Sequence, residues 1–170
     1  RDFTPLVSHP ERDSGETVVA INKLNHVYGE KVALREISLE FKAGEITAVM
    51  GRNGAGKSTL FKSIVGFHKS TDGQIKVLGT DPTELHGRKR LSTIGYIPQE
   101  PSDLLIHPSV AKECAASDRD NGLEDGSTFA FLIRLTPTVN PDAHPRDLSE
   151  GQRLSLVLAL ILCSAPDVLI

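Results

Sequence analysis

The chain has 170 residues, of which 39% are hydrophobic and 24% charged, enough apolar material for one sizeable core. Its net charge of -3 excludes a generally basic surface, so no nucleic acid partner is expected. The longest apolar run, from Leu156 to Cys163, has eight residues. A membrane-spanning helix needs roughly 20, so none is predicted.

The cysteines and histidines carry no metal-binding signal. Cys114 and Cys163 lie far apart in the sequence, without the spacing of a metal site. We therefore expect both to stay reduced and to pack as small apolar residues. The six histidines are scattered without a ligand pattern, so none is assigned to a metal.

The first half of the chain predicts a linker, strands and one helix. Residues 1–17 have linker composition, with two prolines and mixed charges, and the folded domain is expected to start near Val18. Alternating apolar and polar residues predict half-buried strands at 37–42 and between 73 and 79. The run EITAVM at 45–50 does not alternate, which predicts a strand buried on both faces of a parallel sheet.

The segment GRNGAGKST, residues 51–59, follows that run and precedes a helical pattern that ends near Gly66. It fits GxxxxGK[ST], the pattern of a phosphate-binding loop between a strand and a helix. Its glycines let backbone N–H groups face an anion, and the helix N-terminus adds partial positive charge. We expect Lys57 to contact the outer phosphates and Ser58 to bind Mg²⁺. No NKxD motif follows, so guanine specificity is not supported.

The second half predicts mainly helices. The GRKR run at 87–90 is interpreted as a solvated face without a function. Residues between Gln99 and Asp147 combine acidic and small residues with proline-rich joints, which indicates a mostly helical insertion. A long apolar helix follows, and DVLI at 167–170 begins another strand.

The motif LSEGQR, residues 148–153, opens that apolar helix. Ser149 and Gln152 fit a capping box, and Glu150 suits the first helical turn. A helix N-terminus with a serine hydroxyl and Gly151 also suits an anion. A structural cap and a phosphate contact are therefore both open.

The motifs GRNGAGKST, GYIPQ, LSEGQR and PDVLI, in this order along residues 18–170, resemble the ATP-binding cassette (ABC) family. The resemblance implies an α/β fold, a P-loop NTPase with a RecA-like core, an antiparallel β subdomain and a helical insertion. It implies a nucleotide-binding core at 18–98, a helical subdomain at 99–148 that begins with the Q-loop, and the signature helix with the start of the Walker B strand at 149–170.

The resemblance also implies ATP and Mg²⁺ as ligands. Tyr28, in NHVYGEKVAL, matches the aromatic residue that stacks on adenine, although it also suits a packing role at a strand end. Gln99 matches the Q-loop glutamine, which senses Mg²⁺ and the attacking water, although it also suits a surface amide. Leu148 to Gln152 match the LSGGQ signature of the family, and these signature residues would close over ATP held by the opposite cassette of a head-to-tail dimer. The implied nucleotide-binding residues are Tyr28, Gly51, Arg52, Asn53, Gly54, Ala55, Gly56, Lys57, Ser58, Thr59, Ser149, Gly151 and Gln152; the implied catalytic residues are Lys57 and Gln99, and the implied metal ligands Ser58 and Gln99.

Two features depart from the family pattern. Glu150 stands where the family usually has a glycine, so the closed state is expected to be weakened or asymmetric. The sequence stops at Ile170, within what resembles the Walker B strand. We therefore expect a C-terminally truncated piece of a longer protein, with the Mg²⁺-binding aspartate, the catalytic glutamate and the switch histidine beyond Ile170.

Within the family, PQEPSDLLIHPSV and the stretch from LSEGQR to PDVLI are similar to the ATPases of energy-coupling-factor importers of vitamins or nickel and cobalt ions. The likeness is to the second cassette of fused forms. It implies ATP hydrolysis coupled to import, a second cassette and transmembrane subunits as partners, and a cytoplasmic position on the inner face of the cell membrane. Two alternatives stay open: a soluble ABC ATPase of translation or DNA repair, and a regulatory module that binds ATP without hydrolysing it.

Overall fold

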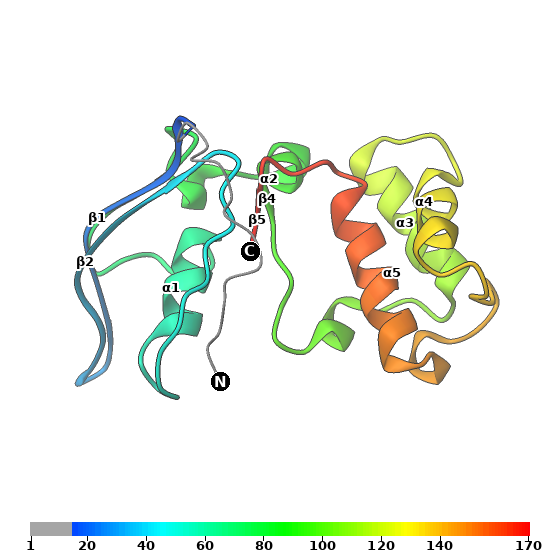
Figure 1. The fold of residues 1–170 in the computed structure, drawn as a ribbon, viewed down its shortest axis with the longest axis horizontal. Coiled ribbons are helices and arrows are strands. Elements are labelled where there is room, and N and C mark those ends of the chain that lie inside the picture. Colours follow the sequence, from blue (N-terminus) through cyan, green and yellow to red (C-terminus); the bar gives the residue numbers. More distant parts are fainter. Residues whose placement is uncertain (1–14) are drawn as a thin grey trace, which may run out of the picture.

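The structure is a computed structural model that describes residues 15–170. The predicted linker at 1–17 therefore lies almost wholly outside the described residues. A curved antiparallel sheet lies at one end of the molecule and a group of helices at the other (Figure 1). Short strands and helices connect the two parts.

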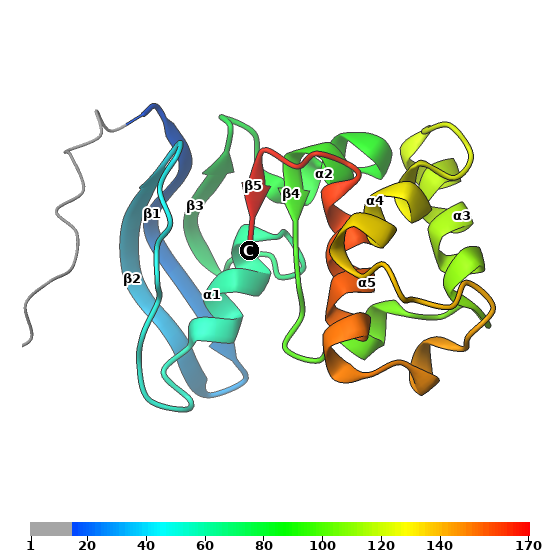
Figure 2. The ribbon, with the colours of Figure 1, turned by 45° about the vertical axis from the view of Figure 1, so that its right-hand side comes forward.

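The sheet contains β1 (Thr17–Tyr28), β2 (Lys31–Lys42) and β3 (Asp72–Val77) in the order β2-β1-β3, all antiparallel. The strands predicted at 37–42 and 73–79 are thus confirmed, and Figure 2 shows β2 and β3 on either side of β1. Ile75 and Val77 of β3 are buried as the alternation predicts. In β2 the alternation holds less well, because Leu39 is 40% exposed.

Helix α1 (Lys57–Ile64) packs against this sheet. Leu60 and Ile64 of the helix share a buried core with residues of all three strands. Gly66 follows the helix end with φ +80°, a left-handed conformation that suits glycine. The helix predicted after Lys57 and its stop near Gly66 are confirmed.

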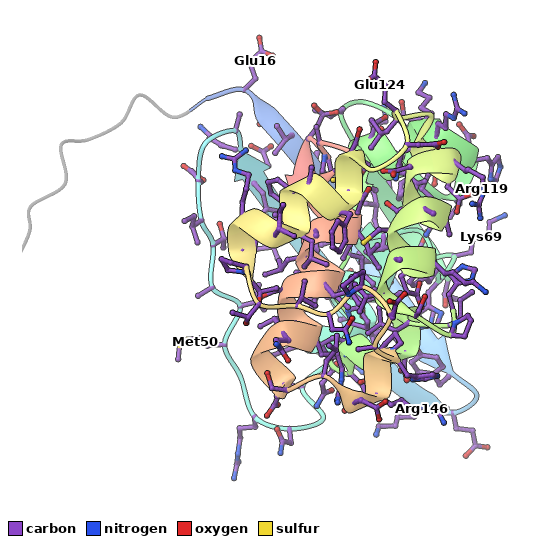
Figure 3. The ribbon with its side chains drawn as sticks, turned by 90° about the vertical axis from the view of Figure 1, so that its right-hand side faces the viewer. Glu16, Met50, Lys69, Arg119, Glu124 and Arg146 are labelled. Carbon is purple, nitrogen blue, oxygen red and sulfur yellow. The ribbon has the colours of Figure 1, made fainter. Side chains whose placement is uncertain are left out.

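The strand predicted at 45–50 is wrong in this structure. Residues 45–50 form no strand, and the side chains of Ile46 and Met50 are 102% and 90% exposed. Figure 3 shows Met50 pointing away from the body of the protein. An apolar strand is buried only when neighbours pair with its backbone and cover both faces. Within the described residues the parallel sheet is the pair β4 (Ile94–Gly95) and β5 (Val168–Leu169), and neither pairs with 45–50.

The far end of the molecule is helical, as the sequence predicts. It contains α3 (Val110–Asn121), α4 (Ser127–Leu135) and α5 (Glu150–Leu162), with the 3₁₀ helices η2 (Pro101–Leu104) and η3 (Pro145–Asp147) beside them. These helices share a second core, separate from that of the sheet, in which Cys114 and Leu156 are fully buried. Both cysteines are free, as expected.

Helix α2 (Gly87–Thr93), which follows η1 (Pro82–Glu84), joins the two parts and corrects the interpretation of GRKR as only a solvated face. The Arg88 guanidinium donates hydrogen bonds to the carbonyls of Asp120 (3.2 Å) and Arg119 (3.5 Å), at the end of α3. Arg90 donates to the Val65 carbonyl at 2.8 Å. Two arginines of this run therefore tie neighbouring elements together. Among the described residues, no helix has the length and apolar character needed to cross a membrane.

Candidate functional site

The loop at 51–56 leads into α1 with the conformation that its glycines permit. Gly54 and Gly56 have φ values of +82° and +91°, and Gly56 is the N-cap of α1. The first turn of α1 contains no acidic residue, so the helix itself places no carboxylate against an anion at this end. Residues 51–55 and Ser58 are exposed, whereas Gly56, Lys57 and Thr59 are half-buried.

Lys57 folds back over the loop. Its Nζ donates hydrogen bonds to the carbonyl oxygens of Gly51 at 2.7 Å and Arg52 at 3.0 Å. A flexible ammonium group can exchange such carbonyl partners for phosphate oxygens without a backbone change. The loop thus combines a mobile cation with a run of exposed backbone.

The loop also lies against the β1–β2 hairpin. A Cβ atom on Gly56 would lie 2.5 Å from the Ala33 carbonyl oxygen and 2.9 Å from the Leu34 side chain. Tyr28 ends β1 and pairs with Lys31 across the same hairpin. The predicted base-stacking residue and the predicted phosphate loop therefore belong to neighbouring elements, although they come from different parts of the sequence.

Tyr28 is 46% exposed and forms a ring cluster with two histidines. Its ring lies 4.6 Å from that of His26 and 5.7 Å from that of His68, both edge-on. Burial, then the nearby His26 and Lys62, lower the pKa of His68. This cluster was not predicted from the sequence; the only signal was that His26 and Tyr28, two residues apart on a strand, share a face.

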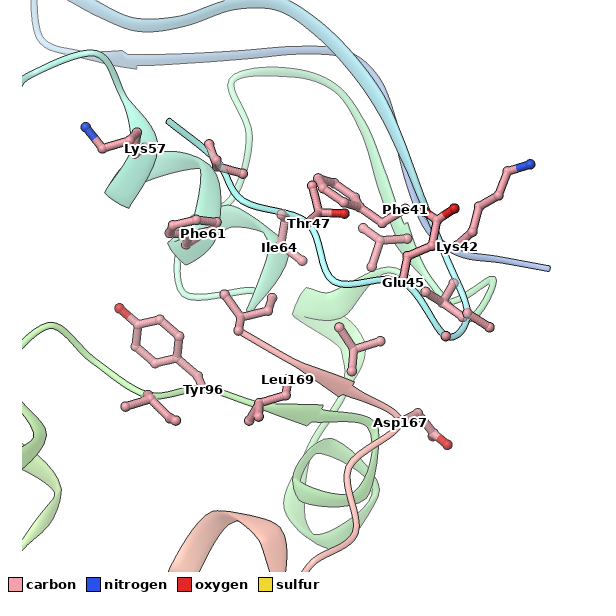
Figure 4. A pocket seen from close by; sticks show the side chains of 18 of the residues that line it. Phe41, Lys42, Glu45, Thr47, Lys57, Phe61, Ile64, Tyr96, Asp167 and Leu169 are labelled. Atoms are coloured by element: carbon pink, nitrogen blue, oxygen red, sulfur yellow. The ribbon is translucent and has the colours of Figure 1, made fainter. Parts of the chain in front are cut away.

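Gln99 follows β4 in an exposed position and lines the same cavity as Lys57 and Ser58. This cavity has a volume of about 560 Å³ and lies between residues 43–49, α1 and the two parallel strands. Figure 4 shows Lys57 and Asp167 at opposite ends of it, with Phe61, Ile64 and Leu169 between. The structure thus brings Lys57, Ser58 and Gln99 to one space, most of whose wall is apolar.

The predicted metal ligands suit Mg²⁺ by chemistry. The hydroxyl of Ser58 and the amide oxygen of Gln99 are hard oxygen donors, which Mg²⁺ prefers together with phosphate oxygens and water. Across residues 15–170 no group of three or more His, Cys, Asp or Glu side chains is arranged to hold a metal. Ser58 and Gln99 are therefore the predicted Mg²⁺ ligands within the described residues.

The signature residues form a helix cap, as predicted. The Ser149 hydroxyl accepts from the Gln152 N–H at 3.3 Å, and the Gln152 side chain accepts from the Ser149 N–H at 3.1 Å. Gly151 is exposed, and a Cβ atom there would meet nothing within 4 Å. The cap is confirmed, and Gly151 stays exposed beside it, with its carbonyl accepting a hydrogen bond from the Ser155 hydroxyl at 2.9 Å.

The two helix N-termini predicted to bind anions are far apart within the chain. The N-termini of α1 and α5 both lie at the lower ends of their helices in Figure 1, on opposite sides of the β4–β5 pair. The structure therefore does not bring Ser149, Gly151 or Gln152 to the phosphate loop of the same chain.

Known proteins resemble this chain over most of its length. A protein of Streptomyces avermitilis that is described as an ABC transporter ATP-binding protein is 45% identical to this chain over 153 residues. The match covers 90% of this chain and 27% of that protein. One from Clostridium tetani is 34% identical and covers 91% of this chain and 36% of its own length. The chain thus spans about a quarter to a third of these relatives.

Solved structures agree with the fold. The structure of cbiO1 from Clostridium perfringens, part of the ABC transporter complex cbiONQ, has a TM-score of 0.72 and 26% identity, covering 90% of this chain and 64% of its own. The ATP-binding subunit of another ABC transporter has a TM-score of 0.74 at 22% identity. The predicted fold class, a P-loop NTPase with an antiparallel β subdomain and helices, is confirmed. The profile described as ABC transporter matches residues 34–170, and the chain therefore belongs to the ABC transporter family.

Proposed function

We propose that this chain is the ATP-binding part of an ABC importer of the energy-coupling-factor type, in which ATP binding and hydrolysis drive transport. The observation that carries the proposal is the loop at 51–56, where Lys57 covers two backbone carbonyls at the N-terminus of α1. The likeness to cbiO1, part of the ABC transporter complex cbiONQ, supports a role in a transporter.

In this proposal the chain first binds the triphosphate. Backbone N–H groups of residues 54–59 surround the phosphates, and Lys57 leaves the loop carbonyls to neutralise the charge that develops during transfer. Mg²⁺, held by Ser58, Gln99 and the phosphates, would supply further neutralisation of that charge. Tyr28 offers its exposed ring to the adenine by stacking. Gln99 orients the attacking water.

A second cassette completes the site. Because Ser149 and Gly151 lie at the start of α5, across the β4–β5 pair from α1, they serve ATP held by a partner cassette in a head-to-tail pair. That partner belongs either to the same polypeptide or to another chain. We further propose that residues 18–98 are the nucleotide-binding core and residues 99–148 the helical subdomain. Residues 149–170 are then the signature helix and the start of the Walker B strand.

A transmembrane subunit docks beside the helical part. A groove between α2, β4 and α3 has a volume of about 350 Å³ and includes Phe67, Leu104 and Ile106. These three side chains are 55%, 39% and 80% exposed. The groove lies next to the segment that follows Gln99, so a bound helix would reach the nucleotide site through that segment. This partner would hold the protein on the cytoplasmic face of the membrane.

The test is mutational and uses the full-length protein. Lys57→Ala should abolish ATP binding measured by calorimetry, whereas Lys62→Ala, on the same helix, should bind like wild type. Ser149→Ala should preserve binding and slow ATP turnover. If Ser149→Ala lowers only the melting temperature, the cap is its whole role.

Isolation of the native protein distinguishes the remaining alternatives. Co-purification with membrane subunits supports the importer. Release without them, with full ATPase activity, favours a soluble ABC ATPase. ATP binding without turnover favours a regulatory module.

A further inference from the structure

Arg153 occupies a position in α5 that does not favour a cation. It is the fourth helical residue, where the helix dipole presents partial positive charge. Its side chain is half-buried rather than extended into water. A guanidinium in such a place needs oxygen acceptors to offset both costs.

The Arg153 guanidinium finds four such acceptors. Nη2 donates to the carbonyls of Leu148 at 3.0 Å and Arg146 at 3.2 Å, and Nε donates to the Pro145 carbonyl at 3.4 Å. Nη1 donates to the Ser102 hydroxyl at 3.4 Å. All three nitrogen atoms of the group are therefore engaged, an arrangement that needs a planar fork and that a lysine ammonium cannot reproduce.

These acceptors belong to two segments, one that precedes Ser149 and one that follows Gln99. Leu148 directly precedes the N-cap Ser149, so its carbonyl fixes the backbone that carries the signature residues. Ser102 lies in η2, three residues after Gln99. A single side chain thus connects the segment that follows Gln99 with the loop that presents Ser149 and Gly151.

We infer that Arg153 is a positioning residue for ATP turnover. It holds the loop at 145–149 so that the Ser149 hydroxyl and the Gly151 backbone face a phosphate on the partner cassette, and it makes that orientation depend on the segment after Gln99. Arg153 itself contacts no nucleotide. The inference rests on the proposed function, because it assigns Arg153 a part in the same composite site.

The test compares four variants of the full-length protein. Arg153→Gln removes the charge and most of the fork, Arg153→Lys keeps the charge, and Ser102→Ala removes only the connection to η2. Arg134→Gln, on the exposed face of α4, is the charge-matched control. Each variant is measured for ATP affinity in EDTA, for kcat and KM with Mg²⁺, and for melting temperature.

Arg153→Gln should bind ATP within about twofold of wild type but turn over about tenfold more slowly or worse, as the loss of hydrogen bonds from a charged donor implies. Arg153→Lys should recover only part of kcat. Ser102→Ala should lower kcat about threefold, because it removes a single hydrogen bond, that from Arg153 to a neutral hydroxyl. Arg134→Gln should behave like wild type.

Two results would overturn the inference. One is an unchanged kcat in Arg153→Gln, and the other is a parallel loss of ATP affinity, kcat and melting temperature, which would make Arg153 a residue of general stability. Failure of the proposed ATPase function gives a different result, since wild type itself would then bind no ATP or would bind it without turnover.

Discussion

Replacing Gly56 with alanine tests the closest approach between the phosphate loop and the β1–β2 hairpin. The residue has φ +91°, and a left-handed conformation costs a non-glycine residue about 1–2 kcal/mol. The added methyl group would also lie 2.5 Å from the Ala33 carbonyl oxygen, so the loop or β2 must move. Such overpacking costs about 1–3 kcal/mol. Together these effects predict a loss of about 2–5 kcal/mol in the free energy of unfolding.

Gly54→Ala is the matched control. Gly54 has a similar φ of +82°, but a Cβ atom there would meet nothing within 4 Å. It should lose only the backbone cost, about 1–2 kcal/mol. Denaturant unfolding of both variants measures the difference. Equal losses of unfolding free energy in the two variants would show that the loop does not approach β2 as closely as in the structure. The contact between the phosphate loop and the β1–β2 hairpin would then be wrong.

Three further predictions concern charge and reactivity. Glu150→Gly should raise kcat about fivefold, because it removes a carboxylate whose repulsion of a phosphate is about 1 kcal/mol in water. The control Glu124→Gly should leave kcat unchanged. An unchanged kcat in Glu150→Gly would show that Glu150 faces away from the nucleotide. Iodoacetamide at pH 8 should modify Cys163 and spare Cys114. Cys114 is only 1% exposed, and its burial, together with nearby Asp118, raises the pKa of its thiol to about 12. If mass mapping finds both cysteines labelled at the same rate, the burial of Cys114 is contradicted. The pKa of His68 in the folded protein lies below its ordinary value of 6.5, so the unfolded chain binds a proton at this histidine more readily than the folded one. The free energy of unfolding should therefore fall as the pH drops through and below 6.5. His68→Gln should reduce that pH dependence of the melting temperature, and an unchanged slope would assign it to other groups.

Local sequence patterns predicted much of the fold. The glycines and Lys57 of GRNGAGKST require a strand, a loop and a helix in sequence, and the loop and helix form as expected. Ser149 and Gln152 lie three residues apart, so their capping box depends on no distant contact. These features could be predicted because the interactions that produce them are short in sequence.

Features that depend on distant partners could not be predicted in the same way. EITAVM has the composition of a buried strand, but burial needs paired neighbours, and the structure leaves Ile46 exposed. The four bonds of Arg153 join η2, η3 and α5, whose packing no local pattern specifies. Its position in the first helical turn was the one available signal.

A structure of the full-length protein with Mg²⁺ and a non-hydrolysable ATP analogue tests the central claim most directly. We expect phosphates against the N–H groups of residues 54–59 and adenine on the Tyr28 ring. Lys57 Nζ should have moved from the carbonyls of Gly51 and Arg52 to a phosphate oxygen. A nucleotide bound elsewhere, or Lys57 still on those carbonyls beside a bound triphosphate, would contradict it.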